Sequence, residues 1–197
     1  MDINAPDFKN EFVRLEPLNA AYYTELEQSG GMDYVWQMLP AIPKSTGYKA
    51  YYNYMVRRNQ DSCIYPFAVL DRQNEDRFIG VSAFIKPHRT HRRVRLGYSW
   101  IRPDVRGGHH YAALQHAMIK RALDWGARRL EAYVESHNQT VIEAILSLGA
   151  QKEGVLRHYQ KSAEGSWVDM TILSFVLEEA ELALQRLDVQ MRTLTSA

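Results

Sequence analysis

The segment from Arg92 to Trp125 constrains the fold of this chain most strongly, because a strand pattern leads through a glycine pair directly into a helix pattern. Residues 92–101 alternate as the residues of one strand do. One expected face carries Leu96, Tyr98 and Trp100, and the other carries Gly97, Ser99 and Ile101. From Tyr111 to Trp125, apolar residues recur every three or four positions, which gives the helix an apolar stripe that would pack on a sheet. A strand and a helix joined in this way predict a layered domain.

Further strand and helix patterns surround this unit. Strands are expected at residues 12–17, 64–71, 77–86, 129–136, 153–160 and 167–177. Helices are expected at residues 20–31, 44–60 and 139–148, the last one capped by Asn138 and stopped by Gly149. Two helices come first, then strands, and then a strand–helix–strand–helix–strand–strand order. This order predicts an α/β (α+β) fold, with helices packed around a mixed sheet, and not a doubly wound nucleotide fold.

The tail after Leu177 carries a heptad-like seam. Its members are Leu177, Ala180, Leu184, Leu187, Met191 and Leu194. A terminal helix lying on its own domain is favoured over a helix that contacts a partner, although a seam this short fits both. We therefore predict one domain at residues 1–177 and a C-terminal helical extension at residues 178–197, with a homodimer left open.

Composition limits the function classes. A formal net charge of +1 on 197 residues does not indicate a general polyanion binder. The single Cys63 excludes an intrachain disulfide and fits a reducing compartment. No stretch approaches the roughly 18 apolar residues of a membrane span, and the first residues lack the apolar core of a signal peptide. The expectation is a cytoplasmic protein without a membrane segment.

The loop between the strand and the helix, RGGHHY at residues 106–111, has the features of an anion site. The first N–H groups of a helix lack intrahelical partners and carry the positive end of the dipole, so a pyrophosphate is a natural ligand there. Gly107 and Gly108 lack a Cβ and let the backbone come close to a ligand, and Arg106 adds a positive charge. Ordinary glycine-rich turns share this spacing, so both interpretations stay open.

Five segments in a fixed order carry a resemblance to a known family. They are FVRLEPL, FIGVSAF, RLGYSWIRPDVRGGHHYAAL, VESHNQTVIEAILSLGAQKEGVLR and WVDMTILSFVL. The chain up to about Leu177 resembles the GCN5-related N-acetyltransferase (GNAT) superfamily, and within it the branch of ribosomal-protein N-terminal acetyltransferases. The resemblance implies a mostly antiparallel mixed sheet with helices on both faces. It also implies acetyl transfer from acetyl-CoA to a primary amine, without a metal.

The resemblance places the cofactor site at the loop. In this family the pyrophosphate loop has the form Arg/Gln-x-x-Gly-x-Gly/Ala, and Arg106 matches its first position. His109 and Tyr111 stand at the two glycine positions, and a protonated His109 would favour an anion. The cofactor-binding residues that the resemblance implies are Trp100, Ile101, Arg106, Gly107, Gly108, His109, His110, Tyr111, Ala112 and Asn138.

The strand before the loop has a second role in the family. Its last residues, here Trp100 and Ile101, bulge away from the next strand and line the pantetheine arm, and a backbone N–H nearby polarises the thioester carbonyl. Asn138 matches an asparagine that touches pantetheine, although it is also a complete N-cap by itself. Asp169 matches the aspartate of the closing strand and is predicted to be structural or to orient the substrate.

Acyl transfer to an amine needs a base for the amine and an acid for the departing thiolate. The resemblance implies an acid in neither usual place, because Val141 stands where this branch often has a serine and Ile145 stands where other branches have a tyrosine. We predict Glu135 as the base and Tyr98 or Ser136 as the proton donor. A solvated carboxylate at the end of a strand is the alternative interpretation of Glu135.

Two groups of residues could serve the acceptor. The cationic run at residues 86–95 could steer phosphates, an acidic acceptor or RNA, but it is more typical of a solvated hairpin end. An acceptor pocket could be walled by aromatic residues, most of which are expected in the core. They are Tyr22, Tyr23, Tyr34, Trp36, Tyr48, Tyr51, Tyr52 and Tyr54.

The histidines show no metal-ligand spacing. Two alternatives to acetyl transfer stay open: a succinyl-CoA or other acyl-CoA transferase, and a catalytically silent module that binds CoA.

Overall fold

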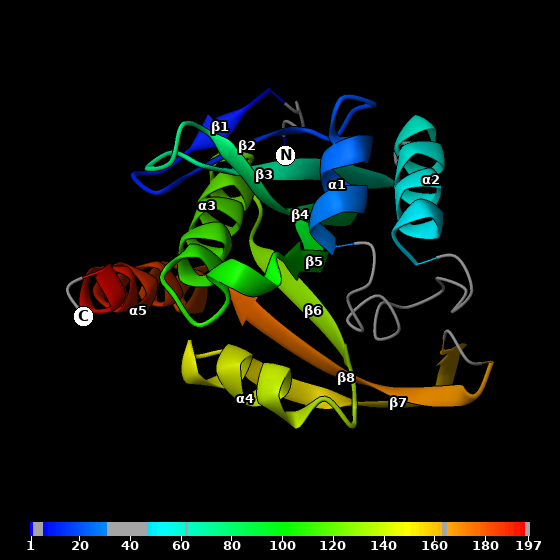
Figure 1. The fold of residues 1–197 in the computed structure, drawn as a ribbon. Helices are drawn as coiled ribbons and strands as arrows, with labels where there is room; N and C mark the ends of the chain where they lie inside the picture. The colour runs from blue at the N-terminus through cyan, green and yellow to red at the C-terminus, as the bar shows by residue number, and fades with distance from the viewer. Residues whose placement is uncertain (2–5, 31–46, 62, 163–164, 196–197) are drawn as a thin grey trace.

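The computed structural model describes residues 1, 6–30, 47–61, 63–162 and 165–195. The described strands form one sheet in the order β1-β2-β3-β4-β5-β6-β8-β7 (Figure 1). They are β1 (Phe8–Lys9), β2 (Val13–Pro17), β3 (Ile64–Asp71), β4 (Arg77–His88), β5 (Arg93–Ile101), β6 (Arg129–Glu135), β7 (Gln151–Lys161) and β8 (Trp167–Val176). Among the described strands, the β5–β6 pair alone is parallel, so the predicted mixed, mostly antiparallel sheet is confirmed.

The helices cover both faces of this sheet, as predicted. They are α1 (Tyr22–Gly30), α2 (Gly47–Gln60), α3 (His110–Asp124), α4 (Gln139–Ser147) and α5 (Leu177–Thr195). Side chains of β3 alternate between two cores. Phe67 and Val69 join the core that contains α3, and Ala68 and Leu70 join the core that contains α1 and α2. In the described part of the chain, no helix is long and apolar enough to cross a bilayer.

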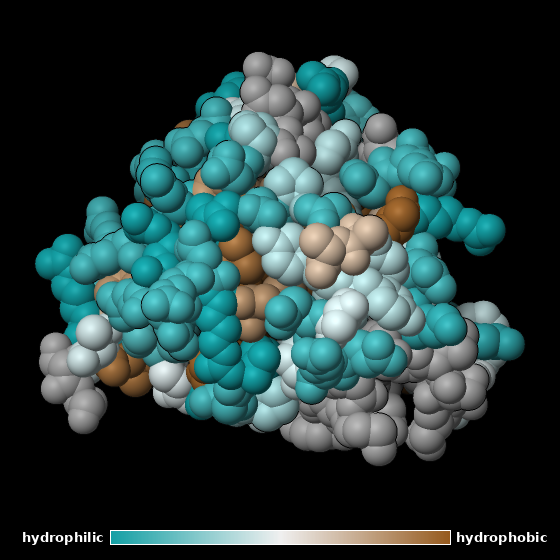
Figure 2. Space-filling model, turned by 45° about the horizontal axis from the view of Figure 1, so that its top comes forward, coloured by the Kyte–Doolittle hydropathy of each residue, from teal (hydrophilic) through white to brown (hydrophobic). Residues whose placement is uncertain are grey.

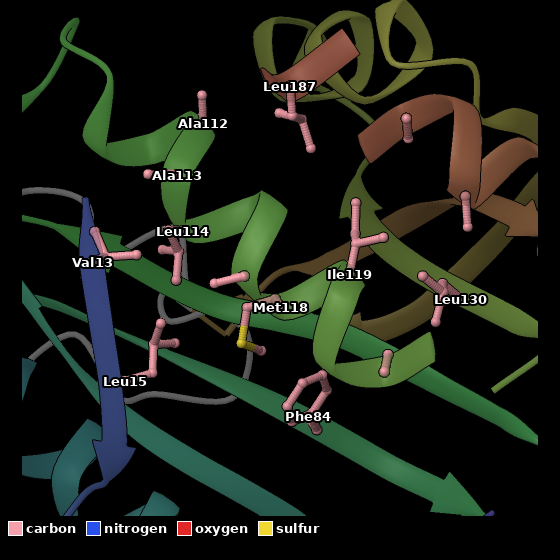
Figure 3. Packing of buried hydrophobic residues seen from close by; sticks show 14 of the residues in the cluster. Val13, Leu15, Phe84, Ala112, Ala113, Leu114, Met118, Ile119, Leu130 and Leu187 are labelled. Carbon is pink, nitrogen blue, oxygen red and sulfur yellow. The ribbon is translucent and has the colours of Figure 1, made fainter. Parts of the chain in front are cut away.

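The apolar stripe of α3 lies on the sheet as its spacing predicts. Leu114 and Met118 are fully buried and lie near Val13 and Leu15 of β2, while Phe84 of β4 packs below the same helix (Figure 3). Burial of one such side chain stabilises the fold by about 1.5–3 kcal/mol. The helix is therefore fixed on the sheet, and its N-terminus has a fixed place.

The C-terminal helix α5 packs against α3, beside which it lies in Figure 1. Its buried residues are Ala180, Ala183, Leu187 and Met191. They belong to the same core as α3, and Leu187 lies above that helix, near Ala112, in the view of Figure 3. The helix thus lies on its own domain, and Leu194 at the end of the predicted seam is 37% exposed.

The alternation predicted for β5 is wrong at Leu96, because a bulge interrupts the strand. Tyr98 has a φ of 52°, and the pairing with β4 shifts register between Val81 and Ala83. Leu96 packs against the core on the α3 face, whereas Tyr98 and Trp100 face α1 and α2. A bulge adds one residue to a strand, so the alternation of side chains before it is out of step with the alternation after it.

Candidate functional site

Two parallel strands separate at the centre of the sheet. β5 and β6 pair over three positions, from Arg93 opposite Arg129 to Arg95 opposite Glu131. Both strands continue beyond this point, yet the described residues show no further pairing between them. Because the strands are parallel, their carboxyl ends lie at the same open end, and this is the usual place for a ligand in sheets of this kind.

The closed end of the gap is held by an ion-pair network. The guanidinium of Arg129 donates to both carboxylate oxygens of Glu153, at 2.7 and 2.5 Å, and to Glu131 at 2.8 Å. Arg93 lies 3.8 Å from Glu131, and the Ser174 hydroxyl donates to Glu153 at 2.7 Å. The network joins β5, β6, β7 and β8 where the strands still pair. It thereby fixes the point from which β5 and β6 diverge.

This network predicts an acid-dependent loss of stability. The hydrogen bond from Arg129 lowers the pKa of Glu153 from 4.5 to about 2, so its contribution is present above pH 4.5 and is lost as the pH falls toward 2. Arg129→Gln should lower the unfolding free energy at pH 7 by about 1 kcal/mol, since both groups are partly exposed. Urea titrations from pH 3 to 7 should show a flatter pH dependence in this variant.

The exposed Lys120–Asp124 pair of α3 provides the control. Lys120→Gln should change the unfolding free energy by less than about 0.5 kcal/mol at every pH. An equal pH slope in Arg129→Gln and the wild type would contradict the role assigned to the network.

The loop from β5 to α3 starts at the carboxyl end of β5, at the open end of the gap. A short 3-10 turn, η2 (Pro103–Val105), follows β5, and the Arg106 Nε donates to the Ile101 carbonyl at 2.9 Å. Asp104 is tied to Arg102 and Arg77, and the hydrogen bond from Arg102 is the main cause that lowers its pKa to about 2. These contacts keep the loop against the end of β5.

The first turn of α3 presents unpaired backbone donors. In the described part of the chain, the N–H groups of residues 107–112 find no backbone acceptor outside the helix, and the first N–H groups of a helix have none within it. No side chain caps α3 at His109. Ala112 is buried in the core and Tyr111 is 41% exposed. The backbone of this turn is thus the part that can bind an anion.

The two glycines of the loop differ. Gly107 has a φ of 83°, a conformation that L side chains rarely adopt, whereas Gly108 has no positive φ. A Cβ on Gly108 would lie 3.6 Å from the Val105 carbonyl oxygen, which is an ordinary contact. Only Gly107 is therefore required by the backbone itself.

A matched pair of variants tests this difference. Gly107→Ala should destabilise the protein by about 1 kcal/mol because the left-handed conformation strains alanine. Gly108→Ala should leave the unfolding free energy within about 0.5 kcal/mol of the wild type or raise it, since alanine restricts the unfolded chain more than glycine does. Urea unfolding measures both. Equal losses in the two variants would contradict the assigned conformations.

The surroundings of His109 disfavour the protonated imidazole that would favour an anion. Its ring packs against Phe12, with centroids 4.6 Å apart, and against the ring of His110 at 4.2 Å. Burial lowers the pKa of His109, and His110 lowers it further, so the imidazole is neutral at pH 7. His110 is held by Asp71, whose Oδ2 lies 3.1 Å from its Nε2. Neither the contact between the two half-buried rings nor the tie to Asp71 follows from the loop sequence.

Glu135 is buried and not a solvated carboxylate at a strand end. It is 7% exposed, and its Oε1 has no partner in the part of the chain that the structure describes. Its Oε2 lies 3.4 Å from the Nε2 of His137. Burial raises the pKa of Glu135, and His137 lowers it to a smaller extent. Alternate residues of β6, including Val134, pack toward α3, so Glu135 faces the opposite side of the sheet.

The two predicted proton donors have different surroundings. The Ser136 hydroxyl lies 2.9 Å from the hydroxyl of the buried Thr171 on β8. Tyr98 packs against the ring of Tyr54, and burial raises the pKa of its phenol, with Tyr54 as a further cause. Tyr98 therefore stays protonated at neutral pH and keeps a proton to donate.

The other predicted site residues have defined structural contacts. The Trp100 and Ile101 side chains are buried in the two cores, so only their backbone can line the gap. The Asn138 Oδ1 accepts from the Val141 N–H at 3.4 Å, which confirms the predicted cap. Asp169 accepts from the His158 N–H at 2.8 Å, which indicates a structural role.

Other predicted features lie partly outside the site. Tyr34 and Trp36 lie outside the described residues, as does the side chain of Tyr48. In the cationic run, Arg92 donates to the Gly126 carbonyl at 2.6 Å and Arg95 lies 3.4 Å from the ring centre of Tyr133. These contacts favour a hairpin end over a nucleic-acid surface.

The described residues contain no cluster of metal-ligating side chains. Figure 2 shows a mostly hydrophilic face with only small apolar patches, so this face offers no extended apolar surface.

Comparisons with known proteins agree with this architecture. Residues 13–151 match the family described as acetyltransferase (GNAT) domain. The chain is 29% identical over 118 residues to the uncharacterized N-acetyltransferase p20 of Bacillus licheniformis. That match covers 57% of this chain and 62% of the relative, which is less than two thirds of its length.

Solved structures share the fold. A GCN5-related N-acetyltransferase from Brucella melitensis superposes with a TM-score of 0.81 at 19% identity, over 96% of this chain and 86% of that one. RimJ of Mycobacterium smegmatis, in complex with CoA-disulfide, superposes with a TM-score of 0.74 at 16% identity, over 91% of this chain and 93% of that one.

Proposed function

The chain belongs to the acetyltransferase (GNAT) family, and on that basis we propose that it transfers an acetyl group from acetyl-CoA directly to a primary amine. The observation that carries this proposal is the gap between β5 and β6, with the unpaired N–H groups of α3 at its open end. A strand-like pantetheine arm fits a gap between strands, and a pyrophosphate fits a helix N-terminus.

The chain's own residues fit this donor. The N–H groups of residues 107–112 and the charge of Arg106 would hold the pyrophosphate, and the Gly107 turn brings the backbone close. The backbone of Trp100 and Ile101, together with the amide of Asn138, would line the arm. Acetyl-CoA supplies the activated acyl group, and the protein supplies position and proton transfer.

Glu135 would take the proton from the incoming ammonium. The pKa of Glu135 is raised above that of an exposed carboxylate and so lies closer to neutral pH. A general base works best when its pKa is near the pH of the reaction. Tyr98, which stays protonated, is the donor that we favour for the departing thiolate, with Ser136 as the alternative.

A covalent cysteine intermediate is disfavoured. The Cys63 carbonyl accepts from the Lys86 N–H, next to the β4 residues that pair with Arg95. That place is the closed end of the gap, at the opposite end of the strands from the N-terminus of α3. The transfer that we propose is therefore direct.

The acceptor that we propose is a primary amine, either a protein N-terminus or a small-molecule amine, in the cytoplasm. RimJ, with which this chain shares its fold, was solved with CoA-disulfide, and that supports a CoA donor here. Succinyl-CoA and other acyl-CoA donors are the alternative within the same chemistry, and a homodimer is compatible with it.

Calorimetry and an amine panel test the proposal. CoA and acetyl-CoA should bind with micromolar affinity, and acetyl-CoA should be consumed in the presence of at least one peptide N-terminus or polyamine. A parallel panel with succinyl-CoA identifies the acyl group. Binding without turnover on any amine would indicate a silent CoA module, and absence of binding to both thioesters and to CoA would refute the proposal.

A further inference from the structure

The bulge of β5 holds a residue in a strained conformation. Tyr98 has a φ of 52°, a conformation that is strained for a residue other than glycine. Tyr98 and Ser99 have no Cα partner on β4, because the pairing passes from Trp100 directly to Gly97. They also lie in the part of β5 that has separated from β6. The peptide between Tyr98 and Ser99 therefore lacks the restraint that pairing with a neighbouring strand gives to the rest of β5.

A buried tyrosine of another element holds this peptide. Tyr51 lies in the first half of α2, and its hydroxyl donates to the Tyr98 carbonyl at 2.7 Å. Tyr51 is fully buried in the core that contains α1 and α2, and its hydroxyl is tied to the bulge. A second contact, 2.9 Å between the Ser82 and Ser99 hydroxyls, holds the neighbouring residue against β4. Burial strengthens such bonds because water does not compete for them.

The direction of one N–H group follows from this bond. The described peptides are all trans, so the N–H of Ser99 points opposite to the Tyr98 carbonyl and hence away from α2. A hydrogen bond to the carbonyl also polarises the N–H of the same peptide. An N–H fixed in advance toward a developing oxyanion is an efficient catalytic device.

We propose that Tyr51 is a positioning residue that holds the Tyr98–Ser99 peptide so that the Ser99 N–H polarises the thioester carbonyl of the acyl donor. This inference rests on the proposed function. Through Tyr51 the orientation of α2 is linked to the donor of the oxyanion bond, since the Tyr51 hydroxyl joins α2 to the backbone of β5 beside the contact between the Tyr54 and Tyr98 rings.

Infrared spectroscopy of bound acetyl-CoA labelled with ¹³C at the acetyl carbonyl tests this inference without an acceptor. In the wild type the bound carbonyl band should lie at lower wavenumber than in solution. Tyr51→Phe should lose about half of that shift or more, while the Kd for CoA stays within about threefold, because the pyrophosphate site is untouched.

Tyr22→Phe is the matched control, since the Tyr22 hydroxyl donates at 2.5 Å to Glu16, away from the bulge. It should keep the full band shift, and urea unfolding should show that both variants fold. Adding Tyr98→Gly to Tyr51→Phe should restore part of the shift, because glycine adopts the positive φ without strain.

The outcomes separate the inference from the function. An unchanged band in Tyr51→Phe, or a loss that Tyr98→Gly does not restore, would overturn the positioning role while acetyl-CoA binding stands. A wild-type band equal to that of free acetyl-CoA would overturn the oxyanion role itself. If the wild type binds no acetyl-CoA, the proposed function fails and the inference fails with it.

Discussion

Glu135→Gln is expected to lower kcat at least about a hundredfold, because a positioned general base contributes roughly 10²–10⁴ to the rate. The glutamine keeps the size of the side chain and removes only its capacity to take a proton. Binding of acetyl-CoA should stay within about threefold, since the carboxylate lies on β6 and not at the pyrophosphate loop. Steady-state kinetics with the best amine of the panel, together with calorimetry, measure both quantities.

The pH dependence identifies the group. Burial raises the pKa of Glu135, so the wild-type rate should rise with pH through that raised pKa, and this limb should disappear in Glu135→Gln. His137 lowers the pKa of Glu135, so His137→Asn should move the limb to higher pH without abolishing it. A limb that stays in place in both variants would exclude Glu135 as the base.

The stability of the Glu135→Gln variant tests the raised pKa of Glu135 independently of the kinetics. The folded state binds the proton of Glu135 more tightly than the unfolded chain does, because its folded pKa is raised. Its stability contribution is therefore full below the unfolded pKa and is lost as the pH rises through the folded pKa. Glu135→Gln should thus unfold at higher urea concentration than the wild type at pH 7, and a purely structural carboxylate would show the reverse.

Most of the fold could be predicted from periodicity. β3 was expected at residues 64–71, which are the residues the structure assigns to it, and Asn138 caps α4 through its predicted side chain. These elements follow from local patterns that tertiary packing does not overrule. The resemblance implied a bulge at Trp100 and Ile101, but its position at Tyr98 could not be predicted from periodicity, because an extra residue in a strand changes the face of its neighbours without changing their hydrophobicity.

The candidate site was predictable only where it is local in sequence. Arg106 and Gly107 could be assigned to a loop before a helix because an unpaired helix N-terminus follows from sequence order alone. The tie of Tyr51 to the Tyr98 carbonyl, and that of Asp71 to His110, join residues far apart in the chain. The sequence shows Tyr51 only as an aromatic residue on the apolar stripe of a helix, and Asp71 only as an acidic residue at the end of an apolar strand. Neither pattern indicates which residue is the partner.

The burial of Glu135 shows the same limit. An acidic residue at the end of a strand is typically solvated, and only the packed structure shows that Glu135 is 7% exposed. The burial that gives this carboxylate a raised pKa comes from the packing around β6. A chemical role of this kind depends on surroundings that no short motif encodes.

Arg106→Ala is expected to weaken CoA binding about 10- to 100-fold, because a hydrogen-bonded charge pair with phosphate contributes roughly 1.5–3 kcal/mol. Pantetheine, which lacks the pyrophosphate, should bind the variant as it binds the wild type. Arg106→Lys keeps the charge but cannot reproduce the bond from Nε to the Ile101 carbonyl, and it should show an intermediate loss.

His109→Gly separates the loop backbone from the histidine ring. The ring packs on Phe12 and is uncharged at pH 7, so its removal should lower the unfolding free energy by about 1–3 kcal/mol and leave the Kd for CoA within about threefold. Calorimetry at two salt concentrations should show a smaller salt dependence only in Arg106→Ala. If CoA and pantetheine lose affinity equally in Arg106→Ala, the arginine holds the loop in shape and the phosphate contact belongs to the backbone of α3 alone.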